Sequence, residues 1–491
     1  MIAQQLPILI VLAPLLAAPL CLILRGYRWP WLLATLAVWS SLASASALLR
    51  RVLAEGTQSY LLGGWEAPWG IELRVDAANG LILVLITAMA SLVLPYARLS
   101  LAREIPDRHA PMAYASVLLL ITGLCGMTVT ADAFNVFVFL EISSLATYTL
   151  IALGRDRRAL TASFQYLIMG TIGATFYLIG VGFLYAMTGT LNMADLAQRL
   201  PDLAGTGTVR VAFAFIVTGI CLKLALFPLH LWLPNAYTFA PSAVSAMLAA
   251  TATKVAVYLL IRFLLTVFGP GFSFGALPVM EILVPLAVVG MLSTSLVAIG
   301  QREVKRMLAY SSVAQIGYMV LGIGMASVVG VSAALMHMFN HALMKGALFM
   351  ALGAIAYRVG GTSMALMRGT ARTMPWTFWA FVIGGLSLVG VPGTAGFVSK
   401  WYLILGAIEL GWWPVVAAIV VASLMALIYI GRVIEAGWFG ESGHEKAREA
   451  PLGLLVPTWL LVAANLWFGI DTRLTVDVAG RAAVQLLGAA P

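Results

Sequence analysis

The chain has 491 residues, of which 62% are hydrophobic and only 10% are charged. Soluble globular domains carry about 25% charged residues, so this composition excludes a soluble protein and predicts one that crosses the lipid bilayer many times. The net charge of +9 requires no nucleic-acid partner, and none is expected, because membrane proteins concentrate Lys and Arg in their cytoplasmic loops.

Fourteen apolar segments have about the 20-residue length that a spanning helix needs. The expected fold class is therefore an all-α polytopic membrane protein with about 14 transmembrane helices. The least distinct boundary lies within residues 110–154, where Asp132 alone marks a turn between two spans. In chain order the predicted spans are 6–24, 30–49, 77–97, 110–130, 132–154, 163–187, 211–233, 242–267, 277–299, 306–326, 329–357, 376–408, 412–433 and 452–470.

The basic residues of the predicted loops are distributed unevenly between the two sides of the membrane. Seventeen lie on one side, and seven lie on the other, namely Arg50, Arg51, Arg74, Arg199, Arg210, Arg473 and Arg481. Cytoplasmic loops are enriched in Lys and Arg, so the first side is expected to be cytoplasmic. An even number of spans then places both termini on the outer, periplasmic side of a bacterial inner membrane.

Five basic residues fall inside the predicted spans: Lys223, Lys254, Arg262, Lys345 and Lys400. The chain has only six lysines, so most of its lysines are placed in the membrane, whereas arginine serves the loops. A buried lysine can release its proton, but arginine stays charged. The intramembrane lysines are therefore candidate proton carriers. Snorkelling to an interface is the alternative for Lys223 and Lys400, and a snorkelling or structural charge is the favoured interpretation of Arg262.

Other titratable residues accompany these lysines. Glu141 lies midway along the fifth span, and a structural ion pair with Lys223 is its alternative role. His337, His341 and Lys345 are spaced by four residues, which places them on one face of a helix. Histidine titrates near neutral pH and suits a proton relay, although a satisfied core histidine is the simpler alternative.

The sequence shows no pattern for a metal or a cofactor. "HMFNH" lacks the glutamate of a metalloprotease helix, and Cys21, Cys125 and Cys221 lie in apolar runs without metal-ligand spacing. There is no phosphate-binding loop, haem pair, dinucleotide glycine pattern or nucleophile triad. We therefore expect no metal site, no cofactor and no catalytic site in this chain; it would count as a translocase only as part of a larger oxidoreductase.

Two predicted spans contain helix-breaking residues. The seventh reads "LKLALFPLHLWLPNA" and contains Pro228 and Pro234, and the twelfth reads "LVGVPGTAGFVSK" and contains Pro392 and Gly393. Paired interruptions in two parts of a chain indicate a transporter built from repeats. Spans 4–8 and 9–13 form two units of five helices, and because five is odd, the two units run in opposite directions.

Several stretches together resemble a known family. They are "FVFLEISSLATYTLIALG", "LKLALFPLHLWLPNAYTFAPSAVSAMLAATATKVAVYLL", "VKRMLAYSSVAQIGYM", "HMFNHALMKGALF" and "GVPGTAGFVSKWYLILGAI". This combination resembles the antiporter-like subunits shared by Mrp-type cation/proton antiporters, respiratory complex I and membrane-bound hydrogenases. The resemblance extends from about the third span to the thirteenth. It implies fourteen helices, inverted repeats of helices 4–8 and 9–13, and breaks in helices 7 and 12.

The resemblance also implies roles for the residues of the first repeat. Glu141 is similar to the helix-5 glutamate that pairs with the helix-7 lysine, here Lys223. Lys254 is similar to the lysine of the connecting helix 8. Protons are then expected to enter near Glu141 and Lys223 and to cross the molecule by way of Lys254.

In the second repeat, His337, His341 and Lys345 fall on the family's helix-11 motif. Lys400 occupies a helix-12 position that is lysine in some subunits and glutamate in others. The resemblance implies that protons pass the two histidines and leave by Lys400.

The subfamily is expected to be the D-type member of an Mrp antiporter, with protons and Na⁺ as the transported ions and other membrane subunits as partners. Lys400 disfavours the M-type member of complex I, and the chain ends too soon after its last span for the L-type or Mrp A-type members. The alternative is a proton-pumping N-type subunit of an NADH:quinone oxidoreductase, or a subunit of a membrane-bound hydrogenase-like complex. A passive scaffold and a subunit coupled to inorganic-carbon uptake also remain open.

Four regions follow from this organisation. Residues 1–109 hold the first three helices, 110–270 the first antiporter-like repeat, 271–434 the second repeat, and 435–491 a charged loop with the fourteenth helix.

Overall fold

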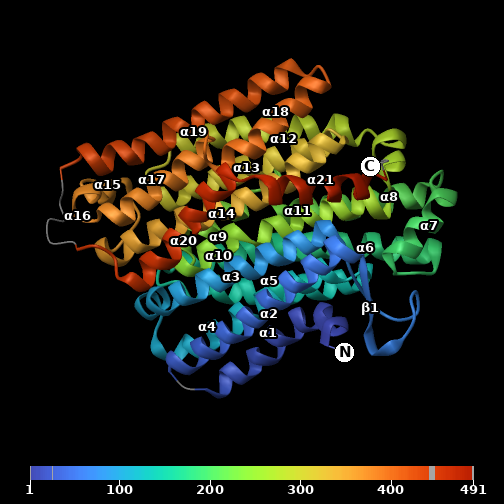
Figure 1. Cartoon of the computed structure of the whole chain (residues 1–491), viewed down its shortest axis with the longest axis horizontal. Coiled ribbons are helices and arrows are strands. Elements are labelled where there is room, and N and C mark those ends of the chain that lie inside the picture. Colours follow the sequence, from blue (N-terminus) through green and yellow to red (C-terminus); the bar gives the residue numbers. More distant parts are fainter. Residues whose placement is uncertain (1, 25, 442–447, 489–491) are drawn as a thin grey trace.

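The computed structural model describes residues 2–24, 26–441 and 448–488. Arg25 and Lys446, two of the seventeen basic residues assigned above to cytoplasmic loops, lie outside the described residues. The described part of the chain is an all-helical bundle with one small hairpin (Figure 1). Thirteen of its helical segments are long and apolar enough to cross a membrane. The bundle thus has the predicted fold class.

The spanning helices follow one another with short connections. Before the first broken span they are α1 (Leu6–Ile23), α2 (Arg28–Glu55), α3 (Ala77–Glu104), α4 (Ala110–Val129), α5 (Ala133–Ala152) and α6 (Arg158–Thr188). Asp132 caps α5 by accepting a hydrogen bond from the backbone N–H of Asn135 at 2.7 Å. This cap separates α4 from α5 where the sequence predicted the turn.

The first broken span consists of α8 (Gly207–Leu224) and α9 (Trp232–Phe239). The span predicted at 211–233 therefore extends further in both directions. Pro228 lies in the interruption, but Pro234 lies in the first turn of α9. A proline there removes only an N–H that has no intrahelical partner, so Pro234 does not itself break the helix.

The next crossing is also interrupted, which the sequence did not predict. It consists of α10 (Ser242–Ala250), α11 (Ala252–Arg262) and the π-helical turn η4 (Phe263–Val267). Thr251, between α10 and α11, departs from helical geometry with φ −123° and ψ −59°. This interruption contains neither Pro nor Gly.

The second repeat contains α12 (Val279–Ile299), α13 (Val304–Gly324), α14 (Val328–Val359), α17 (Pro375–Val389), α18 (Ala395–Glu409) and α19 (Trp413–Phe439), and α20 (Leu452–Ile470) follows it. The pair α17 and α18 forms the predicted twelfth span, and neither half is long enough to cross alone. Pro392 and Gly393 lie in the gap between the two halves, after Gly390 ends α17 in the left-handed conformation with φ 95°.

The two five-helix units run in opposite directions. Successive spans alternate in direction, and the units begin at α4 and at α12, an odd number of crossings apart. The fourth crossing of each unit is broken at a segment that contains proline, between α8 and α9 and between α17 and α18. This agrees with the inverted repeats expected from the sequence.

Short elements cover the two ends of the bundle. One end carries α7 (Met193–Leu203), the π-helical turn η5 (Gly271–Ala276), both termini and a hairpin in which β1 (Gln58–Leu61) pairs antiparallel with β2 (Glu72–Val75), in the register Gln58↔Val75 to Leu61↔Glu72 (Figure 1). The single turns η1 (Ile2–Gln5) and η2 (Leu62–Gly64) and the final helix α21 (Arg473–Leu487) complete this part. The opposite end carries η3 (Asp107–His109), α15 (Met364–Met367) and α16 (Thr370–Thr373). Both termini therefore lie at the same end.

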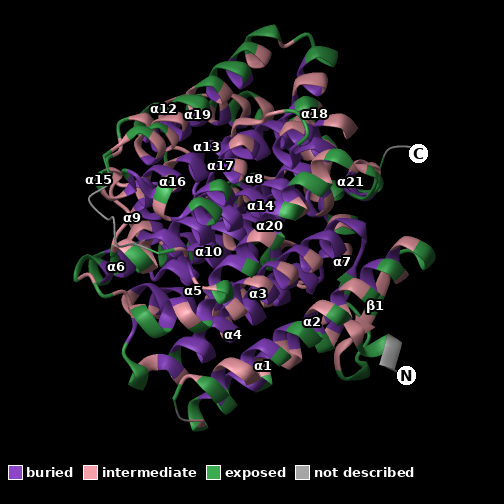
Figure 2. Cartoon of the chain, turned by 60° about the vertical axis from the view of Figure 1, so that its left-hand side comes forward, coloured by how far each residue is buried: buried purple, intermediate pink, exposed green. Residues whose placement is uncertain are grey.

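The inner helices are enclosed by the outer ones (Figure 2). In α13 and in the crossing 242–267, 94% of the apolar window is buried, whereas in α1, α2, α6 and α12 the share is 39%. Charged side chains are expensive in hydrocarbon unless protein or water surrounds them. The inner helices therefore offer the setting in which titratable residues are tolerated at membrane depth.

Candidate functional site: a row of buried titratable residues

The first lysine of the row lies at the end of α8. Lys223 is 9% exposed, and its ammonium donates a hydrogen bond to the hydroxyl of Ser144 on α5 at 2.6 Å. Directly after it, α8 ends at Ala225, a non-glycine residue with φ 61°. The carbonyls at a helix C-terminus carry partial negative charge. The interruption therefore places the C-terminal end of α8, with its partly negative carbonyls, at the level of the buried Lys223 ammonium.

Glu141 lies one turn before Ser144 on the same face of α5. Within the described residues, no ion pair joins Glu141 and Lys223 at 4.0 Å or less, and a carboxylate oxygen of Glu141 is buried without a hydrogen-bond partner. The direct pair suggested by the sequence is therefore not formed in this structure. Ser144 takes the place of the carboxylate as the partner of Lys223.

Lys254 lies on α11 just after the interruption at Thr251. It has no exposed surface, and its ammonium donates to the carbonyl of Ala249, at the end of α10, and more weakly to the hydroxyl of Thr253 at 3.4 Å. A small cavity of about 30 Å³ is lined by both Lys223 and Thr253. This cavity connects the surroundings of the first lysine with those of the second.

The helix α14 carries the next members of the row. The rings of His337 and His341 are stacked, with centroids 6.0 Å apart and planes 4° apart. His341 is completely buried, and neither of its ring nitrogens has a hydrogen-bond partner in the described part of the chain. Lys254 is close enough to both histidines and to Lys345 to interact with them electrostatically. The two repeats meet where α10 packs against α14 and α11 packs against α13.

Lys345 and His337 are held by polar groups of neighbouring helices. The Lys345 ammonium donates to the carbonyl of Leu308 at 2.8 Å and to the hydroxyl of Ser311, both on α13. The nitrogens of His337 lie 2.8 Å from the Ser399 hydroxyl and 3.0 Å from the Gln315 side-chain oxygen. Ser399 directly precedes Lys400, so His337 leads to the last lysine.

Lys400 is the most completely bonded lysine of the row. Its ammonium donates to the carbonyls of Leu388 and Val389, at 2.9 and 3.0 Å, and to the hydroxyl of Ser423 at 3.0 Å. Both carbonyls belong to the C-terminal end of α17, where a cation is favoured. The Lys400 nitrogen also lies 4.9 Å from the ring centroid of Tyr318. The second break thus supplies two of the three acceptors of this lysine.

Six of the seven titratable residues predicted from the sequence are buried, and Glu141, on α5, is partly buried. Sequence reasoning missed the uncharged partners that hold them, which are Ser144, Thr253, Ser311, Gln315, Ser399 and Ser423. Serine is common in membrane helices, and its spacing carries no signal unless the neighbouring helix is known. Only Thr253 and Ser399 carried a signal in the sequence, because each directly precedes a suspected lysine.

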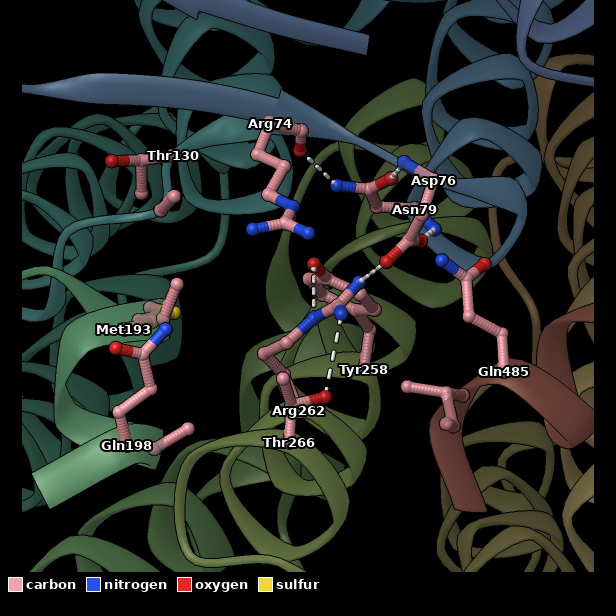
Figure 3. Close-up of a pocket in the computed structure, with 14 residues that line it drawn as sticks. Arg74, Asp76, Asn79, Thr130, Met193, Gln198, Tyr258, Arg262, Thr266 and Gln485 are labelled. Atoms are coloured by element: carbon pink, nitrogen blue, oxygen red, sulfur yellow. Dashed lines mark hydrogen bonds and ion pairs between the residues drawn. The ribbon is translucent and has the colours of Figure 1, made fainter. Parts of the chain in front are cut away.

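Arg262 has a separate setting at the end that carries the termini. It forms a buried ion pair with Asp76, the N-cap residue of α3, at 2.8 Å. It also donates to the hydroxyl of Tyr258 at 3.1 Å. These groups line a cavity of about 330 Å³, into which Arg74 also points (Figure 3). This pairing supports the structural role that the sequence favoured for Arg262. Within the described residues, no cluster of three or more His, Cys, Asp or Glu side chains that could hold a metal ion was found.

Comparison with known proteins places these features in a family. Residues 130–426 match the family described as NADH:quinone oxidoreductase/Mrp antiporter, TM. The chain is 44% identical to the N-type subunit of the NADH-quinone oxidoreductase of Desulforudis audaxviator, over 93% of this chain and 94% of that protein. It is 32% identical to the D-type subunit of the Na(+)/H(+) antiporter of Alkalihalophilus pseudofirmus, over 87% and 85% of the two chains.

A solved structure gives the same assignment. A chain of the Mrp complex from Dietzia sp. DQ12-45-1b superposes with a TM-score of 0.91 and 26% identity, covering 99% of this chain and 98% of the other. The matched family region includes both broken spans and every titratable residue of the row. The resemblance read from the sequence is thereby confirmed, and the chain belongs to the NADH:quinone oxidoreductase/Mrp antiporter transmembrane family.

Proposed function

We propose that this chain is the proton-translocating membrane subunit of a redox-driven complex of the NADH:quinone oxidoreductase type, in the position of the N-type subunit. The observation that carries the proposal is the set of six buried titratable groups from Lys223 to Lys400, with the partly buried Glu141 beside the first of them. The higher identity to an N-type than to a D-type relative favours the redox complex over the cation antiporter. The redox chemistry itself would lie in other subunits of the assembly.

Protons would enter near Glu141 and Lys223, cross by Lys254 to the two histidines of α14, and leave by Lys400. A charge next to a buried lysine changes the free energy of protonating it, by about 1.4 kcal/mol per pKa unit. Moving one charge across 100 mV takes about 2.3 kcal/mol. A change of about two pKa units at one lysine is therefore large enough to move a proton against such a potential.

The contact of Lys223 with Ser144 is consistent with a role of Glu141 as the charge that changes the protonation of Lys223. A carboxylate that paired permanently with Lys223 would hold the lysine charged, whereas a hydroxyl partner leaves its protonation open to control. We propose that Glu141 approaches Lys223 in one state of the cycle and retreats in the other, and that the structure represents the separated state.

The antiporter is the second candidate, with Na⁺ exchanged for protons, and the 32% identity to a D-type relative favours it. In either case the chain would work with other membrane subunits in a bacterial inner membrane, with its termini on the outer side. That orientation follows from the excess of basic residues in the loops of the opposite side.

Purification of the native assembly from the membrane distinguishes the two candidates. The redox complex predicts flavin and iron–sulfur absorbance in the purified assembly and quinone-dependent acidification of vesicles without Na⁺. An assembly without these chromophores that exchanges Na⁺ for protons would overturn the redox assignment in favour of the antiporter.

A further inference from the structure

Tyr148 on α5 carries a buried hydroxyl group to which the described part of the fold gives no hydrogen bond. The residue is 5% exposed, and its hydroxyl has no hydrogen-bond partner among the residues that the structure describes. A polar group in this position is unfavourable, because it has lost its hydration without gaining a bond. Phenylalanine would fill the same volume without that cost. No hydrogen bond of good geometry within the described residues therefore accounts for a hydroxyl here.

The hydroxyl lies close to the ammonium of Lys223. A methyl group built on Gly170 of α6 would lie 2.0 Å from the Tyr148 hydroxyl oxygen and 3.3 Å from the Lys223 nitrogen. The Tyr148 hydroxyl thus occupies the space that the missing side chain of Gly170 provides, and the Lys223 ammonium borders the same space. Lys223 currently uses another acceptor, the hydroxyl of Ser144.

Glu141, Ser144 and Tyr148 are spaced by three and four residues and form one face of α5. Lys223 therefore has three possible oxygen partners along that face, at successive turns. Tyr148 lies furthest from the end of the molecule that carries the termini, because α5 runs away from that end.

The second repeat shows the same three groups joined together. There Lys400 donates to the Ser423 hydroxyl at 3.0 Å, and Ser423 lies 3.4 Å from the hydroxyl of Tyr318. Tyr318 lies on α13, the second helix of its unit, just as Tyr148 lies on the second helix of the first unit. A lysine with a serine and a tyrosine hydroxyl thus occurs at both breaks.

We propose that the Tyr148 hydroxyl is a second hydrogen-bond partner of Lys223, which the ammonium reaches when it leaves Ser144. The ammonium keeps its proton during this move and carries it one turn along α5, away from Glu141. Tyr148 is then a positioning residue. It gives the charged lysine a hydrogen-bond acceptor at the position that is further from Glu141. This inference rests on the proposed role of Lys223 as a proton carrier.

Tyr148→Phe tests the proposal in the intact complex. Proton flux in vesicles is expected to fall about tenfold, since the free energy of a hydrogen bond to a charged group corresponds to a factor of about this size. The thermal stability of the complex is expected not to fall, because the lost hydroxyl makes no bond in this structure. Tyr114→Phe is the matched control: it also removes a buried hydroxyl without a partner, but from α4, outside the row, and should leave the flux unchanged.

Gly170→Ala provides an independent measurement. The added methyl group would displace the Tyr148 hydroxyl, so flux should fall in the wild-type background. In the Tyr148→Phe background the oxygen is absent, and the same substitution should lower flux much less. Equal losses in both backgrounds would contradict the proposal.

The outcomes separate this inference from the function on which it rests. If Lys223→Ala abolishes flux and Tyr148→Phe leaves it at the wild-type level, the second partner is overturned and the carrier role stands. If Lys223→Ala leaves flux intact, the carrier role itself is overturned.

Discussion

Each buried lysine of the row is held by oxygen atoms that an irregular piece of backbone or a nearby serine supplies. Lys254 bonds the carbonyl at the end of α10, and Lys400 bonds the last carbonyls of α17. Carbonyls at a helix end have no intrahelical partner and attract cations. An interruption and its lysine therefore stabilise each other, which explains why the two occur together.

Lys400→Arg should abolish proton flux while the complex still assembles. Arginine keeps the positive charge that the α17 carbonyls bind, but it does not release a proton under these conditions. Flux in vesicles and subunit composition after purification are the measurements.

The matched control is Lys305→Arg on α13. Lys305 is also buried and also donates to a backbone carbonyl, that of Ala240, but it lies outside the row. The carrier role of Lys400 would be contradicted if both arginine variants lowered flux equally.

Gly390→Ala should lower both stability and flux. With φ at 95°, a side chain costs about 1–2 kcal/mol, and the new Cβ would lie 3.0 Å from the Cδ atom of Lys400. Gly393→Ala has a similar backbone cost, at φ 85°, but meets nothing within 4 Å. The thermal stability should therefore fall by a similar amount in the two variants, whereas proton flux should fall only in Gly390→Ala. A loss of flux in both variants would show that the effect does not depend on the contact with Lys400.

At the scale of elements, the interruptions differ in how far the sequence revealed them. Pro228, Pro392 and Gly393 marked two breaks, because proline and glycine disturb a helix by their own chemistry. The break at Thr251 was missed, since it contains neither residue and depends on the packing of α10 and α11. The contact of Lys223 with Ser144 was also missed, because a sequence does not show which of two neighbouring oxygens, that of Glu141 or that of Ser144, a lysine contacts.

The ion pair between Asp76 and Arg262 joins the start of α3 to the end of α11 (Figure 3). Arg262→Gln should destabilise the complex by about 3–5 kcal/mol, because it leaves a buried carboxylate without its partner. Thermal unfolding of the purified complex measures this loss.

A second substitution, Asp76→Asn, removes the orphaned charge but keeps an N-capping oxygen for α3. The double variant should therefore be more stable than Arg262→Gln alone. A double variant that is less stable than either single one would show that the pair contributes little and that packing dominates.

At the scale of the whole molecule, the sequence predicted the number of crossings, the inverted units and the shared end of the two termini. These features depend on hydrophobic length and on parity, which are properties of the sequence alone. Which helices are inner and which are outer depends on their mutual packing, and the sequence did not show it. The side of the membrane on which the termini lie stays a prediction from loop charge.

Short tags on the N- and C-termini test that orientation. Both are expected to react with a membrane-impermeant reagent added to the periplasmic side of intact cells, whereas a tag inserted between α15 and α16 should react only after permeabilisation. The reverse pattern would invert the proposed direction of the whole row.

The central claim is that protons move through the buried row between the two repeats. Its most direct test is proton flux through the assembled complex in vesicles, compared for the wild type and for the variants Glu141→Ala, Lys223→Ala and Lys400→Ala. The account predicts that each variant assembles and that flux is lost or strongly reduced in all three. Wild-type flux in all three variants would contradict it.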